Sequence, residues 1–212
     1  MRRTYGLMFL LPALVAGWVL SPIAGADPKQ DAPKIIPKEV RALEGTYTGA
    51  WTIYGINDKG EVVKRMAWTD TMKAGSPEVK GDRAYVTTTD EMAFDGAKGP
   101  PFKVEGMEGY YLTKDGGLGD YFVETFGQVN RLAKLGANIW SYAAPVAEQE
   151  LTRLGFPKGA SGQHVVVKVV TTEQGVETHR VSRLTTVNWK DKDGKERAAQ
   201  FVSLQGHHKR QP

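Results

Sequence analysis

The residues best able to bind a metal or to move protons are histidines, because the chain has no cysteine. The four histidines are His164, His179, His207 and His208. A zinc site draws three or four convergent His, Cys or carboxylate ligands, and the sequence has no spaced motif of that kind. A hairpin near Gln174 would place His164 opposite Arg183 or Thr185, away from His179. We therefore expect no metal and no cofactor, and interpret the histidines as solvated or hydrogen-bonded.

Motifs for catalysis are equally scarce. No serine lies in Gly-x-Ser-x-Gly. Asp90 and Glu91 are neighbours on an expected strand, so their carboxylates point to opposite faces and cannot share a substrate. The segment 191–194 looks superficially like a calcium loop, but aligning its glycine puts Trp189 and Gln200 where carboxylates belong. We assign no catalytic residue, and an enzyme that uses scattered acids and bases stays an alternative.

The elements that must position any site are β-strands. About eight segments have the alternation and β-branched or aromatic content of strands, at 46–56, 61–72, 83–92, 102–113, 120–126, 163–170, 176–189 and 197–206. Turns rich in Asn, Asp and Gly separate several of them, as at 57–60 and 191–194. The pattern predicts an all-β fold, a single antiparallel up-and-down β-barrel of about eight strands with a short helical insertion. Closure would hide the edge strands of a monomer without disulfides.

Short helices are expected at two places. The segment 37–44 has proline in its first turn and glycine just past its end. Val129, Leu132 and Leu135 are spaced by three, which predicts a helix, and a second helix is expected from Pro145 to Leu154. Together these form an insertion at about 128–158 that could cap an open end of the barrel. The barrel domain is expected over 39–206.

The first residues are typical of an export signal. Arg2 and Arg3 precede an apolar run from Leu7 to Leu20, and Ala24 to Ala26 offers small residues for cleavage before Asp27. The run is shorter than the ~20 residues that span a membrane, so we expect no stable anchor once 1–26 is removed. We predict a periplasmic or extracellular protein, with a flexible leader over 27–38.

The charge balance gives no reason to expect a nucleic acid or an anionic surface as partner. The chain has 28 basic and 24 acidic residues. The only dense basic cluster, His207 to Arg210, lies near the end of the chain. We interpret 207–212 as a solvated basic tail and not as a binding patch, and the sequence does not indicate a protein partner.

One short motif resembles a known family. Gly49-Ala50-Trp51, on the first strand after a short helix, resembles the opening motif of lipocalins and the broader calycin group. Gly119-Asp120-Tyr121 is loosely similar to the second motif, with glycine in place of threonine. An arginine that stacks on the tryptophan would be the third element, and Arg180 and Arg183 are both candidates. The resemblance implies an eight-stranded cup with Trp51 packed across its closed end.

Aromatic side chains are the best candidates to line a cavity, because they bury large area and several carry a polar group. We expect Gly49 and Trp51 to be structural. The candidate ligand-binding residues are Trp68, Trp140, Tyr142, Tyr54, His179 and Arg183. The leading hypothesis is a secreted or periplasmic β-barrel that binds a small apolar or amphipathic molecule. The alternatives are an extracytoplasmic structural or interaction protein without a ligand, and an enzyme on a calycin-like barrel.

Overall fold

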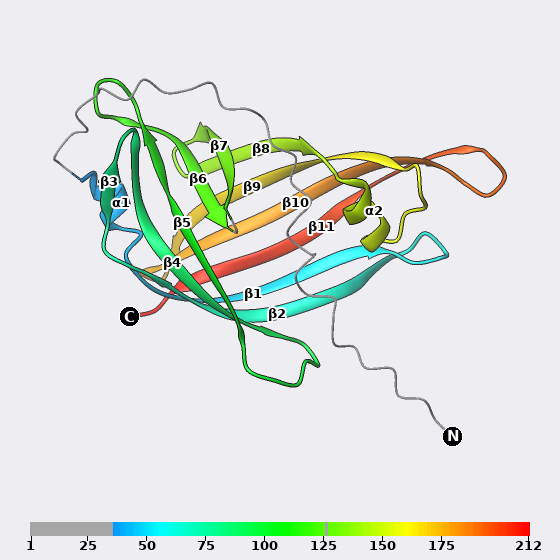
Figure 1. The fold of residues 1–212 in the computed structure, drawn as a ribbon, viewed down its shortest axis with the longest axis horizontal. Helices are drawn as coiled ribbons and strands as arrows, with labels where there is room; N and C mark the ends of the chain where they lie inside the picture. Colours follow the sequence, from blue (N-terminus) through cyan, green and yellow to red (C-terminus); the bar gives the residue numbers. More distant parts are fainter. Residues whose placement is uncertain (1–35, 126) are drawn as a thin grey trace.

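The computed structural model describes residues 36–125 and 127–212, and its fold is almost entirely β (Figure 1). In chain order the elements are α1 (Lys38–Arg41), β1 (Gly45–Ile56), β2 (Val62–Ala74), β3 (Glu78–Lys80), β4 (Arg83–Phe94), β5 (Phe102–Leu112), β6 (Leu118–Thr125), β7 (Gln128–Gly136), β8 (Ile139–Pro145), α2 (Glu148–Arg153), β9 (Ser161–Glu173), β10 (Val176–Lys190) and β11 (Glu196–Arg210). No helix in this part of the chain is both long and apolar enough to cross a membrane.

The strands form a closed antiparallel barrel. Successive strands pair with one another from β4 to β11, β11 pairs with β1, and β1 pairs with β2. The pairing of β2 with β4, from Trp68 opposite Phe94 to Ala74 opposite Thr88, completes the ring. Within the described residues the barrel therefore has 10 strands, and the short β3 pairs with β4 outside it. Closure satisfies the backbone groups that open edges would leave unpaired.

Two hydrophobic clusters fill the regions next to the helices, which lie at opposite ends of the barrel (Figure 1). At the α1 end, Val40 and Leu43 pack with a set of buried rings that includes Tyr47, Tyr121 and Trp140. At the α2 end the cluster consists of Ile56, Val146, Leu151, Leu154, Phe156, Val187 and Phe201. The helix expected from Pro145 to Leu154 is thus present as α2, and it covers one end of the barrel.

The prediction of a helix at Val129 to Leu135 is wrong, and it explains why eight strands were expected instead of ten. Residues 128–136 form β7 and residues 139–145 form β8. A helix would have buried Leu132 and Leu135 on one face, whereas Leu135 is 67% exposed and Leu132 is buried. Asn130 and Leu132 line the barrel interior together, with the two-residue period of a strand. The insertion at 128–158 is therefore mainly two barrel strands followed by α2.

The interpretation of residues 207–212 as a solvated basic tail is also wrong. Residues His207 to Arg210 continue β11, and they pair with Tyr47 to Ala50 of β1. The strand β1 begins at Gly45, and the backbone groups of its first residues need hydrogen-bond partners on a neighbouring strand. The last residues of β11 provide these partners. Of the leader expected over 27–38, Ile36 packs against the core cluster at the α1 end and Lys38 begins α1. The expected signal peptide (1–26) and the expected leader up to residue 35 lie outside the described residues.

Candidate ligand cavity and its charged lining

The interior of the barrel contains a partly open cavity of about 290 Å³. Side chains from all ten barrel strands line it, so the cavity is the interior of the barrel itself. Its apolar lining consists of Trp51, Trp68, Met72, Met92, Val123, Leu132, Val166, Val181 and Leu204, with Tyr142 beside them. Its charged lining consists of Asp70, Asp90, Glu108, Lys168, His179, Arg183 and His208. The interior is therefore hollow and amphipathic.

Two stacked tryptophans form a flat apolar wall of the cavity. Trp51 on β1 lies opposite Trp68 on β2, with ring centroids 5.9 Å apart and ring planes 9° from parallel. On its other side Trp51 faces Gly206 of β11, where an added Cβ would lie 2.1 Å from the indole ring. Glycine at this position lets the indole lie flat against the neighbouring strand. We call Trp51 and Trp68 the tryptophan wall.

Glu108 and Lys168 form an ion pair across the barrel interior. Glu108 comes from β5 and Lys168 from β9, their side chains are only 9% and 6% exposed, and Nζ lies 3.3 Å from Oε2. Lys168 Nζ also donates a hydrogen bond to Oη of Tyr121. Burial alone would raise the pKa of Glu108, but Lys168 and the nearby His179 outweigh it and hold that pKa well below its ordinary value. The Glu108–Lys168 pair is thus a carboxylate matched by a cation.

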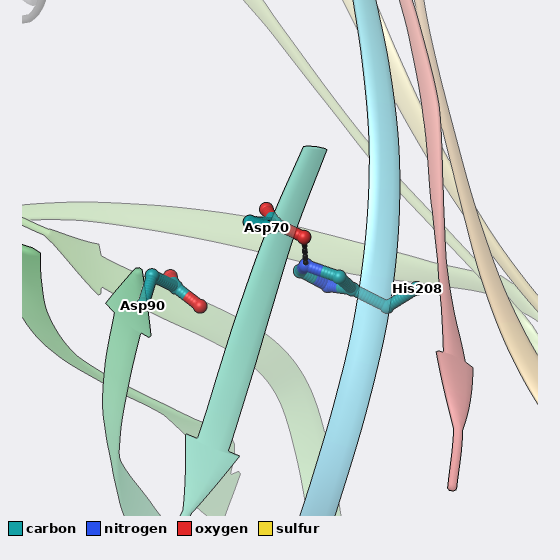
Figure 2. Close-up of side chains that lie close together, drawn as sticks. All are labelled: Asp70, Asp90 and His208. Carbon is teal, nitrogen blue, oxygen red and sulfur yellow. Dashed lines mark hydrogen bonds and ion pairs between the residues drawn. The ribbon is translucent and has the colours of Figure 1, made fainter. Parts of the chain in front are cut away.

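A second charged group lies beside the tryptophan wall and consists of Asp70, Asp90 and His208 (Figure 2). His208 reaches from β11 across β1, and its Nε2 lies 3.0 Å from Oδ1 of Asp70 on β2. Asp90 on β4 points toward them, and one ligand atom from each residue lies within 4.8 Å of the others. We call these residues the Asp–Asp–His group.

Gly49 makes the contact between Asp70 and His208 possible. It lies on β1 directly opposite both residues, Asp70 on one side and His208 on the other. A Cβ at this position would lie 2.0 Å from Oδ1 of Asp70 and 2.9 Å from Nε2 of His208. Any other side chain would therefore push the two groups apart. The two ends of the Gly-x-Trp motif therefore have different roles in this chain. Gly49 leaves room for the contact between Asp70 and His208, and Trp51 is half of the tryptophan wall.

Within the Asp–Asp–His group, the carboxylate of Asp90 has the fewest interactions that offset its negative charge. Its Oδ1 is buried and has no hydrogen-bond partner among the described residues. Burial raises the pKa of Asp90 to about 7, with Asp70 and Glu108 adding to the rise and His208 opposing it. At neutral pH this carboxyl therefore titrates between a protonated and an ionised form.

Polar residues near α2 complete the interior. Arg183 forms an ion pair with Glu150 of α2, and its Nε donates a hydrogen bond of 2.8 Å to Oγ of Ser203. His164 is buried and lies opposite Thr185, one of the two positions that the hairpin register allowed. Burial, assisted by Arg183, lowers the pKa of His164 to about 4, so its ring is neutral under ordinary conditions. At this end of the barrel, the charge of Arg183 is therefore already paired within the protein.

The structure brings together four of the six candidate ligand-binding residues: Trp68, Tyr142, His179 and Arg183 line the cavity. Trp140 does not, because it is 4% exposed and packs against Tyr110 and Tyr121 in the core. Tyr54 lines a separate pocket with Arg180 and His207. Trp51, which the family resemblance would place across the closed end, lines the cavity.

Sequence reasoning missed the most distinctive residues of the cavity. Lys168 was not among the candidate residues, yet it is only 5% exposed and forms an ion pair with Glu108 inside the barrel. Asp70 lies between Trp68 and Met72 on the inward face of β2, and that alternation was a usable signal. His208 carried no such signal, since it was expected in a tail.

Comparison with known proteins found no matching family model, no similar curated protein and no similar solved structure.

Proposed function

We propose that the protein binds a small amphipathic molecule inside its barrel. The observation that carries this proposal is the cavity inside the barrel, which has the tryptophan wall on one side and the Asp–Asp–His group next to it. Ligand sites typically combine apolar walls with a few polar groups that fix orientation. We further propose, from the N-terminal sequence, that the protein acts after export.

The volume limits the size of the ligand. About 290 Å³ corresponds to roughly ten water molecules at about 30 Å³ each. A ligand of on the order of ten non-hydrogen atoms fits, such as one aromatic ring with a short polar substituent. A planar ring is favoured because it can stack on Trp51 or Trp68.

The charged lining limits the chemistry of the polar end. Lys168 is paired with Glu108, and Arg183 with Glu150 and Ser203. Two carboxylate oxygens of the lining, Oδ1 of Asp90 and Oε1 of Glu108, have no hydrogen-bond partner among the described residues. The indole N–H groups of Trp51 and Trp68 and Nδ1 of His179 are also without such a partner there. A ligand that donates hydrogen bonds or carries positive charge satisfies these oxygens, whereas a carboxylate is repelled.

Isothermal titration calorimetry with benzylamine, benzyl alcohol and benzoate tests the proposal, because these probes share one ring and differ in charge. We expect saturable binding of the amine and the alcohol, and weaker binding of benzoate. Trp68→Leu should weaken binding about 10-fold or more, since a stacked ring contributes roughly 1 to 3 kcal/mol. Tyr54→Leu, in the separate pocket, is the matched control and should bind normally. No saturable binding by any probe, or equal losses in both variants, would overturn the proposal.

A further inference from the structure

The Asp–Asp–His group has the composition of a metal site. It offers two carboxylate oxygens and one imidazole nitrogen, from three different strands, within one 4.8 Å cluster. Three protein ligands with a free position facing a cavity are typical of metal sites that also bind water or a small ligand. The group borders the cavity along all three side chains.

One separation in the group, that between His208 and Asp70, is close to the spacing of two ligands on one ion. In a tetrahedral zinc site with bonds of about 2.0 to 2.1 Å, ligand atoms lie roughly 3.3 Å apart. Nε2 of His208 and Oδ1 of Asp70 are 3.0 Å apart and share a proton as a hydrogen bond. A metal ion would replace that proton, which leaves to solvent, and would bond to both atoms. Asp90 then needs only a side-chain rotation to bring an oxygen into range.

The charge balance of the cavity favours a cation. Lys168 offsets one carboxylate, that of Glu108, while Arg183 and His179 contact Glu150 and Glu177. Asp70 and Asp90 share the single imidazole of His208. The buried side chain of Glu108, 9% exposed, also keeps its Oε1 without a hydrogen-bond partner in the described chain and lines the same cavity. A divalent ion at the group would offset this excess of negative charge.

We propose that Asp70, Asp90 and His208 bind one divalent transition-metal ion inside the barrel, with Zn²⁺ as the ion that fits best. An imidazole among the ligands favours zinc and its neighbours, whereas Ca²⁺ takes six to eight oxygen ligands and Mg²⁺ binds mainly through water and phosphate. Gly49 holds Asp70 and His208 at bonding distance for this ion. The metal requires no organic ligand, so this inference extends beyond the proposed function.

The test is a calorimetric titration of the untagged, chelator-treated protein with ZnCl₂ at about pH 7.5, where the ligands can lose their protons. We expect one zinc per chain. Asp90→Asn and His208→Gln should each weaken binding by at least about 100-fold. The matched controls are the adjacent residues on the opposite faces of the same strands: Glu91→Gln, whose carboxylate pairs with exposed Lys103, and His207→Gln. Both controls should bind zinc as the unchanged protein does.

A second readout separates loss of the site from loss of the fold. Zinc should raise the melting temperature of the unchanged protein and of both controls, and leave that of Asp90→Asn unchanged. Cobalt absorption spectra of the Co²⁺-loaded protein should show the intense visible bands of four coordination. Zinc binding that is absent, or that is equally strong in Asp90→Asn and His208→Gln, would overturn the proposal. Trp68→Leu should still bind zinc, so failure of the metal site and failure of organic-ligand binding give different results.

Discussion

The two charged groups inside the barrel differ in how their charges are balanced. The Glu108–Lys168 pair contains one acid and one base, and Tyr121 adds a hydrogen bond. The Asp–Asp–His group contains two acids and one imidazole. Burying charge is costly unless it is matched, so the first group can persist without a ligand. The second keeps a carboxyl that needs either a proton or a bound cation, and this difference is the reason that we propose it as the binding site.

Removing the cation of the matched pair should have the largest effect. Lys168→Met would leave the buried Glu108 without its partner, and we expect it to lower the free energy of unfolding by about 3 to 5 kcal/mol. Urea denaturation followed by circular dichroism measures this change. Lys103→Met removes the cation of an exposed pair and should change stability by less than about 1 kcal/mol. Similar losses of unfolding free energy in both variants would show that the interior ion pair contributes no more to stability than the exposed one.

A side chain at Gly49 should disturb the unmatched group next most strongly. Gly49→Ala places a Cβ 2.0 Å from Oδ1 of Asp70, and we expect it to lower the free energy of unfolding by about 2 to 3 kcal/mol. It should also abolish zinc binding, because Asp70 and His208 separate. Gly136→Ala is the control, since its Cβ would lie 3.8 Å from the nearest atom and make ordinary contact. A Gly49→Ala protein that is fully stable and binds zinc normally would contradict the role of this glycine.

Asp90→Asn should stabilise the metal-free protein. Replacing a carboxylate that is paired with a cation would instead destabilise it. Burial raises the pKa of Asp90 from 3.8 to about 7, so between these values the folded chain holds a proton that the unfolded chain has lost. The stability contributed by that proton is lost as the pH rises to about 7. We expect Asp90→Asn to gain about 1 to 2 kcal/mol above pH 7, after allowance for partial exposure, and to gain nothing near pH 4.

Urea denaturation across this pH range, in buffer with a chelator, measures the gain. Glu91→Gln is the matched control, because its carboxylate lies on the outer face beside Lys103 and carries no such burial cost. An Asp90→Asn protein that is less stable than the unchanged chain at high pH would show that the carboxylate has a partner in the folded state.

The sequence predicted the parts of the fold that depend on local pattern. Alternation and turn residues located most of the strands, and the hairpin register placed His164 opposite Arg183 or Thr185, of which Thr185 is its partner. The strand β7 was missed because Leu135 faces outward at 67% exposure, which breaks the apolar alternation. The short β8, with its apolar and small residues, was absorbed into the same expected insertion.

The candidate site was only half predictable, for a different reason. Trp68 and Arg183 could be proposed from residue type and strand position alone. The charged contacts join residues far apart in the chain: Asp70 meets His208 across 138 positions, and Glu108 meets Lys168 across 60. Those contacts depend on which strands become neighbours when the barrel closes, and alternation along one strand carries no information about that closure.

The central difference between the two groups can be measured directly by a pH titration of the side-chain carboxyl carbons with NMR, using ¹³C-labelled, metal-free protein. The structure predicts that Asp90 titrates with a midpoint near pH 7. It also predicts that Glu108 stays ionised to a pH well below its ordinary value. If Asp90 and Glu108 instead both titrate near pH 4, as solvated carboxyls do, the interior contains no unmatched charge and the account is wrong.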